Sequence, residues 1–175
     1  MKCNRFFTGF LGVAFILLSV HVRADEAEDE RVARLRGLDA VVVSVDKLGK
    51  DVEDDGLTSD QLQQDVELRL RKAGIRVLSQ TEWKEKPLTP VLYVRSHLVK
   101  GKGSLAGLYF THLSFALGEY ARLVRNPAII AIAMTWESQS STGSVGTQKV
   151  RQFRESVADK TDEFTNAFLA ANPKK

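Results

Sequence analysis

The sequence is poor in cysteine. Its single cysteine is Cys3, close to the amino end. No disulfide can therefore form within the chain, and no cluster of thiolates can hold zinc or an iron–sulfur centre. Residues 25–175 contain no cysteine at all, so this part must be held together by a hydrophobic core. It is long enough to bury one.

The sequence also lacks the spacing of the common catalytic and ligand-binding motifs. No serine stands in a G-x-S-x-G elbow. The turn 101–104 has glycine and lysine but not the Walker spacing, and Asp54 and Asp55 lack the rest of a calcium loop. We therefore expect no enzymatic activity, no cofactor and no metal.

Beyond residue 24 the chain has no excess of positive or negative charge. The whole chain has 25 Lys and Arg against 22 Asp and Glu, a net charge of +3. Lys2, Arg5 and Arg23 account for that surplus, and the first 24 residues contain no acid. Residues 25–175 are balanced, so the isoelectric point of about 9.0 is no argument for nucleic-acid binding.

The amino end has the pattern of a secretory signal peptide. Lys2 and Arg5 form a basic region, residues 6–20 are apolar, and residues 22–24 resemble a cleavage site. An uncleaved anchor would need about 20 apolar residues, and this run ends at His21. Cys3 precedes the apolar run, so it is not placed as a lipoprotein cysteine. We predict a signal peptide over 1–24, cleavage after Ala24, a periplasmic or secreted location and no stable membrane anchor.

After the signal we expect a flexible arm over 25–37 and a single domain over 38–173. Valines begin a central strand near residue 40, and the residues around 75–78 form a short one. Residues 91–99 and 108–124 form a hairpin in which opposing residue numbers sum to 209. Residues 125–128 form a turn, and 129–136 form a strand that is apolar on both faces and ends at Trp136, which we place in the core. Gly118 marks a bulge, and 138–147 is predicted as a loop.

Two helices are predicted, over 58–73 and 148–171. The first has a T-x-x-Q capping box at Thr58 and Gln61, an apolar stripe every three to four residues, and Gly74 as its carboxyl-terminal stop. The second carries phenylalanines on one stripe. The element order β-α-β-β-β-β-α predicts an α+β fold. We expect a two-layer sandwich with a mostly antiparallel sheet of about five strands and two helices.

The hairpin register sorts its residues into a core face and a more exposed face. His97 and His112 should face each other on the exposed one. A metal would need a third ligand, and no Asp or Glu falls on the same local face, so we expect a solvated histidine pair. Aromatic residues are enriched at binding surfaces. The possible interaction surface consists of Tyr93, Arg95, His97, His112 and Trp83.

Residues 56–62 with 65–75, Thr135-Trp136-Glu137 and the segment from Phe164 to Lys174 resemble a family of uncharacterised exported bacterial proteins. The strand–helix–strand opening is also similar in layout to the amino-terminal domain of the periplasmic TolB protein, an α+β module that engages envelope partners. No propeller repeats follow here. The export signal, the lack of a catalytic constellation and this layout together predict a non-enzymatic domain that binds a protein partner or envelope component. The alternative is a small-molecule or lipid carrier with a cleft between the carboxyl-terminal helix and the sheet.

Overall fold

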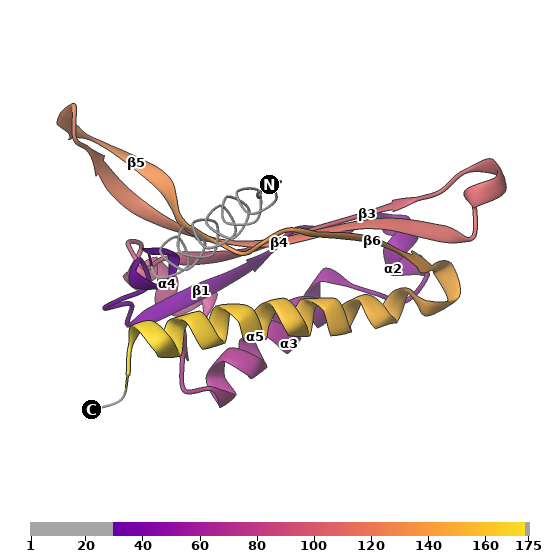
Figure 1. Cartoon of the computed structure of the whole chain (residues 1–175), viewed down its shortest axis with the longest axis horizontal. Helices are drawn as coiled ribbons and strands as arrows, with labels where there is room; N and C mark the ends of the chain where they lie inside the picture. The colour runs from indigo at the N-terminus through magenta and orange to yellow at the C-terminus, as the bar shows by residue number, and fades with distance from the viewer. Residues whose placement is uncertain (1–29, 174–175) are drawn as a thin grey trace, which may run out of the picture.

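A computed structural model describes residues 30–173 of the chain. The predicted signal peptide (1–24) and the start of the predicted arm (25–29) lie outside the described residues. Two long helices, α3 (Ser59–Lys72) and α5 (Phe153–Ala171), pack side by side on one face of a sheet. Among residues 30–173, no long helix covers the other face of the sheet (Figure 1). No helix within residues 30–173 is long and apolar enough to cross a membrane.

The sheet has six strands and mixed directions. These are β1 (Ala40–Val45), β2 (Arg76–Val77), β3 (Val91–Lys100), β4 (Leu108–Leu123), β5 (Asn126–Glu137) and β6 (Ser141–Gly146). The order is β2-β1-β3-β4-β5, and β6 also pairs with β4. β1 is parallel to β2 and β3, and the other pairs are antiparallel. The predicted α+β class is confirmed.

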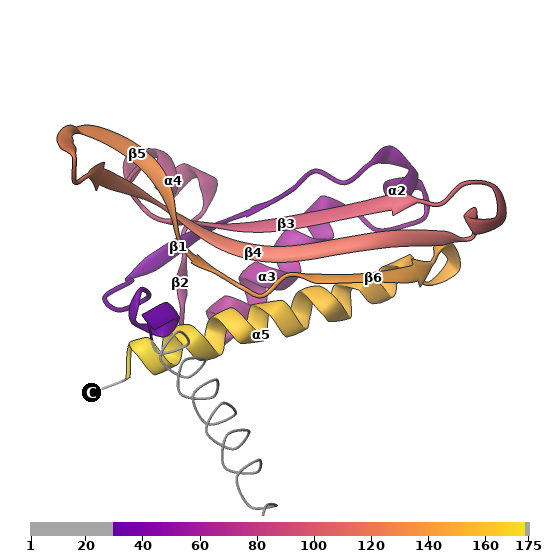
Figure 2. The same cartoon turned by 45° about the horizontal axis from the view of Figure 1, so that its top comes forward.

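The structure has more elements than the sequence predicted. The segment 138–147, expected to be a loop, contains β6, because the 16-residue β4 extends past β5 and offers β6 a partner (Figure 2). Short helices α2 (Lys50–Asp54) and α4 (Gln80–Glu85) form where no helix was predicted. The predicted second helix begins as a 3-10 turn over Thr147–Gln152 before α5. A further 3-10 turn, Gly103–Leu105, closes the β3–β4 hairpin.

The predicted β3–β4 register is confirmed, with Leu92 opposite Leu117 and His97 opposite His112. The residues predicted for the core face are buried there, and buried Trp136 makes a T-shaped contact with Phe164, with ring centroids 5.1 Å apart. The core therefore lies between the sheet and the two long helices. Its members include Val41, Val43, Leu62, Val66, Leu70, Leu92, Val94, Phe115, Leu117, Trp136, Phe164 and Phe168.

The capping signals predicted for α3 are also confirmed. Thr58 accepts a hydrogen bond from the Gln61 amide, and the Gln61 side chain accepts one from the Thr58 amide. At the other end Gly74 has a φ of 86°, and the Ile75 amide donates to the Leu70 carbonyl. These bonds form a Schellman motif, which only glycine enters without strain.

We predict that Thr58→Ala lowers the free energy of unfolding by about 1 kcal/mol, because the first turn of α3 loses its side-chain cap. Thr58→Ser keeps the hydroxyl and should stay within a few tenths of a kcal/mol of the native chain. Urea denaturation followed by circular dichroism measures both. Equal losses in the two variants would contradict the cap as the cause.

The structure corrects the extent of the flexible arm. Residues 30–33 are helical, and Leu35 is fully buried in the core. The Asn172 side chain donates to the Leu35 carbonyl and accepts from the Gly37 amide. Residues 30–37 therefore belong to the folded domain, because Leu35 and the partly buried Val32 pack against the core.

β5 differs most from its prediction. Its apolar run was expected to be buried on both faces, yet Ile129, Ile130, Ile132 and Met134 are each at least 41% exposed. The turn that precedes it is formed by residues 124–125 instead of 125–128. The outer parts of β4 and β5 rise as a two-stranded arm beyond the helices (Figures 1 and 2). The predicted bulge is confirmed, since the β4–β5 register shifts between Leu117 and Gly118.

Candidate functional site

The face of the sheet turned away from α3 and α5 is the strongest candidate site. We call it the outer face, and it is formed on β3 and β4 by Tyr93, Arg95, His97, Val99, Phe110 and His112. Strand alternation brings these residues together, because the opposite set of side chains is required in the core. Four of the five residues predicted as an interaction surface lie on it. The fifth, Trp83, lies on the separate helix α4 and does not share this face.

An apolar pair and a histidine pair lie next to each other on the outer face. Val99 is directly opposite Phe110 and the two are 64% and 45% exposed. The next pair on the same face is His97 and His112, whose rings stack with their centroids 6.2 Å apart. The free face of an antiparallel sheet is normally polar, so an exposed aliphatic–aromatic pair is unexpected there. Val99 and Phe110 were not among the predicted residues, although the register would have placed them.

The expectation that no Asp or Glu falls on the same local face as the histidines is wrong. The Asp46 carboxylate lies 3.8 Å from His97 Nε2, because β1 runs beside β3 and Asp46 follows its last residue. Glu137, opposite Ala116 in the sheet, pairs with Arg95 at 3.2 Å. Even so, residues 30–173 contain no group of three or more potential ligands placed to hold a metal ion.

A hydrogen-bonded group fastens the far end of the β3–β4 hairpin to α2. The buried Tyr109 hydroxyl donates to Asp55 Oδ2 at 2.7 Å, and the Lys100 ammonium donates to the same oxygen at 2.9 Å. The bonds from Lys100 and Tyr109 lower the pKa of Asp55. Burial, followed by the bond to Asp55, raises the pKa of Tyr109 to about 12. The group therefore keeps its charges at neutral pH and fastens this end of the hairpin to the residue that ends α2.

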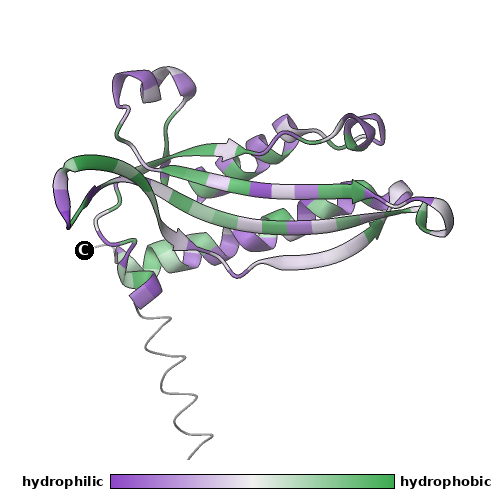
Figure 3. Ribbon diagram, turned by 90° about the horizontal axis from the view of Figure 1, so that it is seen from above, coloured by the Kyte–Doolittle hydropathy of each residue, from purple (hydrophilic) through white to green (hydrophobic). Residues whose placement is uncertain are grey.

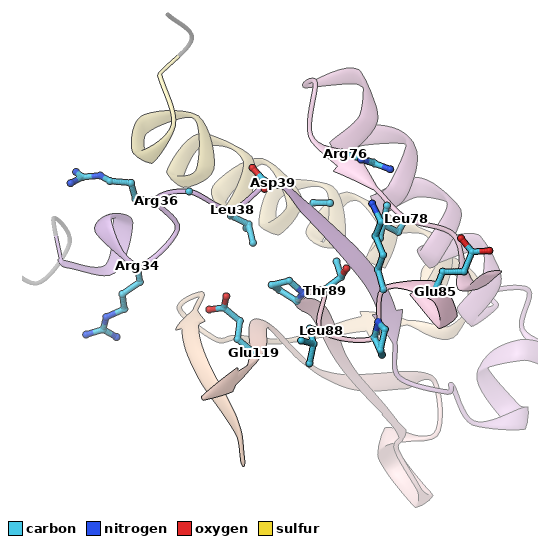
Figure 4. A pocket seen from close by; sticks show the side chains of 15 residues that line it. Arg34, Arg36, Leu38, Asp39, Arg76, Leu78, Glu85, Leu88, Thr89 and Glu119 are labelled. Atoms are coloured by element: carbon cyan, nitrogen blue, oxygen red, sulfur yellow. The ribbon is translucent and has the colours of Figure 1, made fainter. Parts of the chain in front are cut away.

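A hollow lies at the opposite end of the sheet, where β1 begins (Figure 4). It has a volume of about 690 Å³ and gathers charges of both signs. Its cationic side chains are Arg34, Arg36, Arg76 and Lys86, and its carboxylates are Asp39, Glu85 and Glu119. Glu119 is occupied by a short hydrogen bond from the Thr135 hydroxyl. The mixed charges select no particular class of ligand.

The space between α5 and the sheet does not form the cleft that the carrier alternative requires. Phe153, Phe164, Phe168 and Trp136 fill the space between α5 and the strands. A hollow of about 290 Å³ lies where β6 meets the start of α5, and it is lined mainly by serine, threonine and glycine. Sites for lipids and small apolar molecules are lined mainly by apolar side chains. The geometry thus favours the outer face over a carrier cleft.

No protein-family model matches the chain, and no curated protein sequence matches it. Among solved structures the chain is similar to a single-substitution variant of PelC from Paraburkholderia phytofirmans, which was solved as a dodecamer. The two share 18% identity, the match covers 71% of this chain and 87% of that chain, and the TM-score is 0.43. A minor lipoprotein from Acinetobacter baumannii shares 12% identity over 77% of this chain and 93% of that chain, with a TM-score of 0.38. The similarity to TolB stays a prediction.

Proposed function

We propose that this chain is an exported, non-enzymatic binding domain and that its outer face holds a protein of the cell envelope. The observation that carries the proposal is the exposed pair Val99 and Phe110 beside the stacked histidines. Aromatic and aliphatic groups of this kind form the centre of protein interfaces, with polar groups around them. Here Asp46, Arg95 and Glu137 supply such a polar rim.

The export pattern at residues 1–24 supports a periplasmic or secreted location. The absence of recognisable catalytic spacing in the sequence supports binding instead of catalysis. The two long helices are already used to cover the core on the inner face, so the outer face is the broad surface left for a partner. A partner with an apolar patch bordered by both charges would complement it.

The test is site-specific photocrosslinking in a bacterium that exports the full-length gene product. A photoreactive phenylalanine replaces Phe110 on the outer face or, as a control of similar exposure, Leu68 on α3, which is 53% exposed. We expect a defined adduct with one envelope protein from position 110 and none from position 68. Val99→Asp, introduced beside the probe, should reduce the yield of that adduct at least about fivefold, because it places a charge in the contact.

Identical adducts from both positions would contradict the proposal, as would no adduct from either. An adduct of twice the mass of the chain itself, with no other, would show that position 110 contacts a second copy and would also count against a separate partner. Mass spectrometry of the adduct distinguishes these results.

A further inference from the structure

The free edge of β5 lacks the protection that edge strands normally have. β5 pairs with β4 on one side only, and residues 127–136 contain no charged side chain. Natural proteins protect such edges with lysines, prolines, bulges or inward-pointing charges. β5 has a single proline, Pro127, next to the turn. An aliphatic, uncharged edge of this length tends to pair with another strand.

The same strand belongs to an arm that no other part of residues 30–173 covers. We call residues 118–134 the hairpin arm, and it rises from the body of the domain as a largely apolar ribbon (Figure 3). Its exposed large apolar residues, each between 41% and 99% exposed, are Tyr120, Val124, Ile129, Ile130, Ile132 and Met134. Together they present on the order of 600 Å² of surface, close to the roughly 800 Å² that each partner contributes to a standard interface.

The charges at the two ends of the arm are of opposite sign. Arg122 and Arg125 lie near its tip, where Arg122 donates to the Pro127 carbonyl at 2.9 Å. Glu119 lies near its base, whereas the neighbouring Glu137 already pairs with Arg95. If two arms lie antiparallel, the basic tip of one lies beside Glu119 of the other. The arm is therefore complementary in charge to a second copy of itself.

We propose that two copies of this chain pair through antiparallel β5 strands, related by a two-fold axis, to form one continuous sheet. Arg31 donates to the Glu137 carbonyl at 3.1 Å, so the base of the edge is already occupied. The free edge runs from Asn126 to Met134, and the axis passes near its middle, at Ile130. This contact uses the edge of the sheet, not the outer face, and does not rest on the proposed function.

Cysteine crosslinking tests the register. The background is the full-length gene product with Cys3→Ser, which removes the single native cysteine. Ile130→Cys should oxidise to a disulfide-linked dimer, because residues on the axis face each other at a distance a disulfide can bridge. Ala128→Cys mixed with Ile132→Cys should give the mixed dimer in preference to either homodimer. Thr142→Cys on the exposed β6 edge is the control and should remain unlinked.

Sedimentation of the purified protein tests the energetics. The native chain should sediment as a dimer. Ile130→Lys should raise its dissociation constant at least about tenfold, because a charge would be buried without a partner. Thr142→Lys should leave the dissociation constant unchanged, and circular dichroism should show that both variants are folded.

Three results would overturn the proposal. The first is a native chain that sediments as a monomer at every concentration. The second is a native chain that forms a larger ring while Ile130→Cys gives no disulfide-linked dimer. The third is a monomer that floats with anionic lipid vesicles in a density gradient and no longer does so when Ile130→Lys is introduced. This result would assign the hairpin arm to a lipid surface. None of these outcomes affects the photocrosslink expected from position 110, so failure here is distinct from failure of the proposed function.

Discussion

Phe164→Ala is expected to lower the free energy of unfolding by about 3–5 kcal/mol, the usual cost of removing a fully buried aromatic side chain. Phe164 is 0% exposed and lies at the centre of the contact between α5 and the sheet. Its ring makes a T-shaped contact with Trp136, with centroids 5.1 Å apart, and its centroid lies 6.5 Å from that of Phe168. For a domain of this size, the melting temperature should fall by roughly 10 °C or more.

Leu169→Ala is the matched control on the same helix. Leu169 is 37% exposed, so its loss leaves little cavity and should cost no more than about 1 kcal/mol. Thermal and urea denaturation of both variants measure the difference. A loss for Phe164→Ala no larger than that for Leu169→Ala would mean that the core does not depend on the α5 aromatics.

The parts of the fold that the sequence predicted well depend on contacts between near neighbours. The cap of α3 needs only Thr58 and Gln61, three residues apart, and its end needs a glycine at position 74. The β3–β4 register follows from matching apolar alternation across one short turn. Such features are decided locally, so they can be read from the chain without knowledge of the whole fold.

The features that the sequence missed depend on where an element ends relative to the rest of the molecule. An apolar run such as 129–134 is typical of a buried strand, but burial requires helices long enough to cover it. β5 reaches beyond them. β6 has a sequence of small and polar residues with weak strand propensity, and it forms because β4 supplies a long partner. Asp46 approaches His97 only because β1 runs beside β3.

The candidate site shows the same division. The register placed Tyr93, Arg95, His97 and His112 on one face, and the structure brings them together. Trp83 was grouped with them because aromatic residues are enriched at binding surfaces, a compositional argument with no geometry behind it. The structure places it on α4, which has its own capping box at Ser79 and Glu82. Pairing rules thus located the outer face, whereas composition alone did not.

Glu163 offers a second large effect, because it fastens residues 30–37 to α5. Its carboxylate accepts a hydrogen bond from Arg31 at 2.9 Å and one from Lys160 at 2.6 Å. Burial alone would raise the pKa of Glu163, but the bonds from Arg31 and Lys160 outweigh it and lower the pKa from its ordinary 4.5. Arg31 also lies over the Trp136 ring, 5.3 Å from its centre.

We predict that Glu163→Gln lowers the free energy of unfolding at pH 7 by about 1–2 kcal/mol, because two partly buried cations lose their common anion. Asp162→Asn, at the position directly before Glu163 on α5, breaks the exposed pair with Arg69. It should lower the free energy of unfolding by no more than about 0.5 kcal/mol. Equal losses in the two variants would contradict a special role for Glu163. Hydrogen exchange should quicken at residues 31–36 in Glu163→Gln and not in Asp162→Asn.

The pH dependence of this difference follows from the direction of the pKa shift. A carboxylate whose pKa is lowered by folding stabilises the native state above its ordinary pKa, and the stabilisation disappears as the pH falls through the lowered value. The gap in stability between the native chain and Glu163→Gln should therefore be fully present at pH 7 and should narrow below about pH 4.5. Urea denaturation of both proteins from pH 7 to pH 3 measures it. A gap that stays constant over this range would show that lost packing, instead of the charge of Glu163, destabilises the variant.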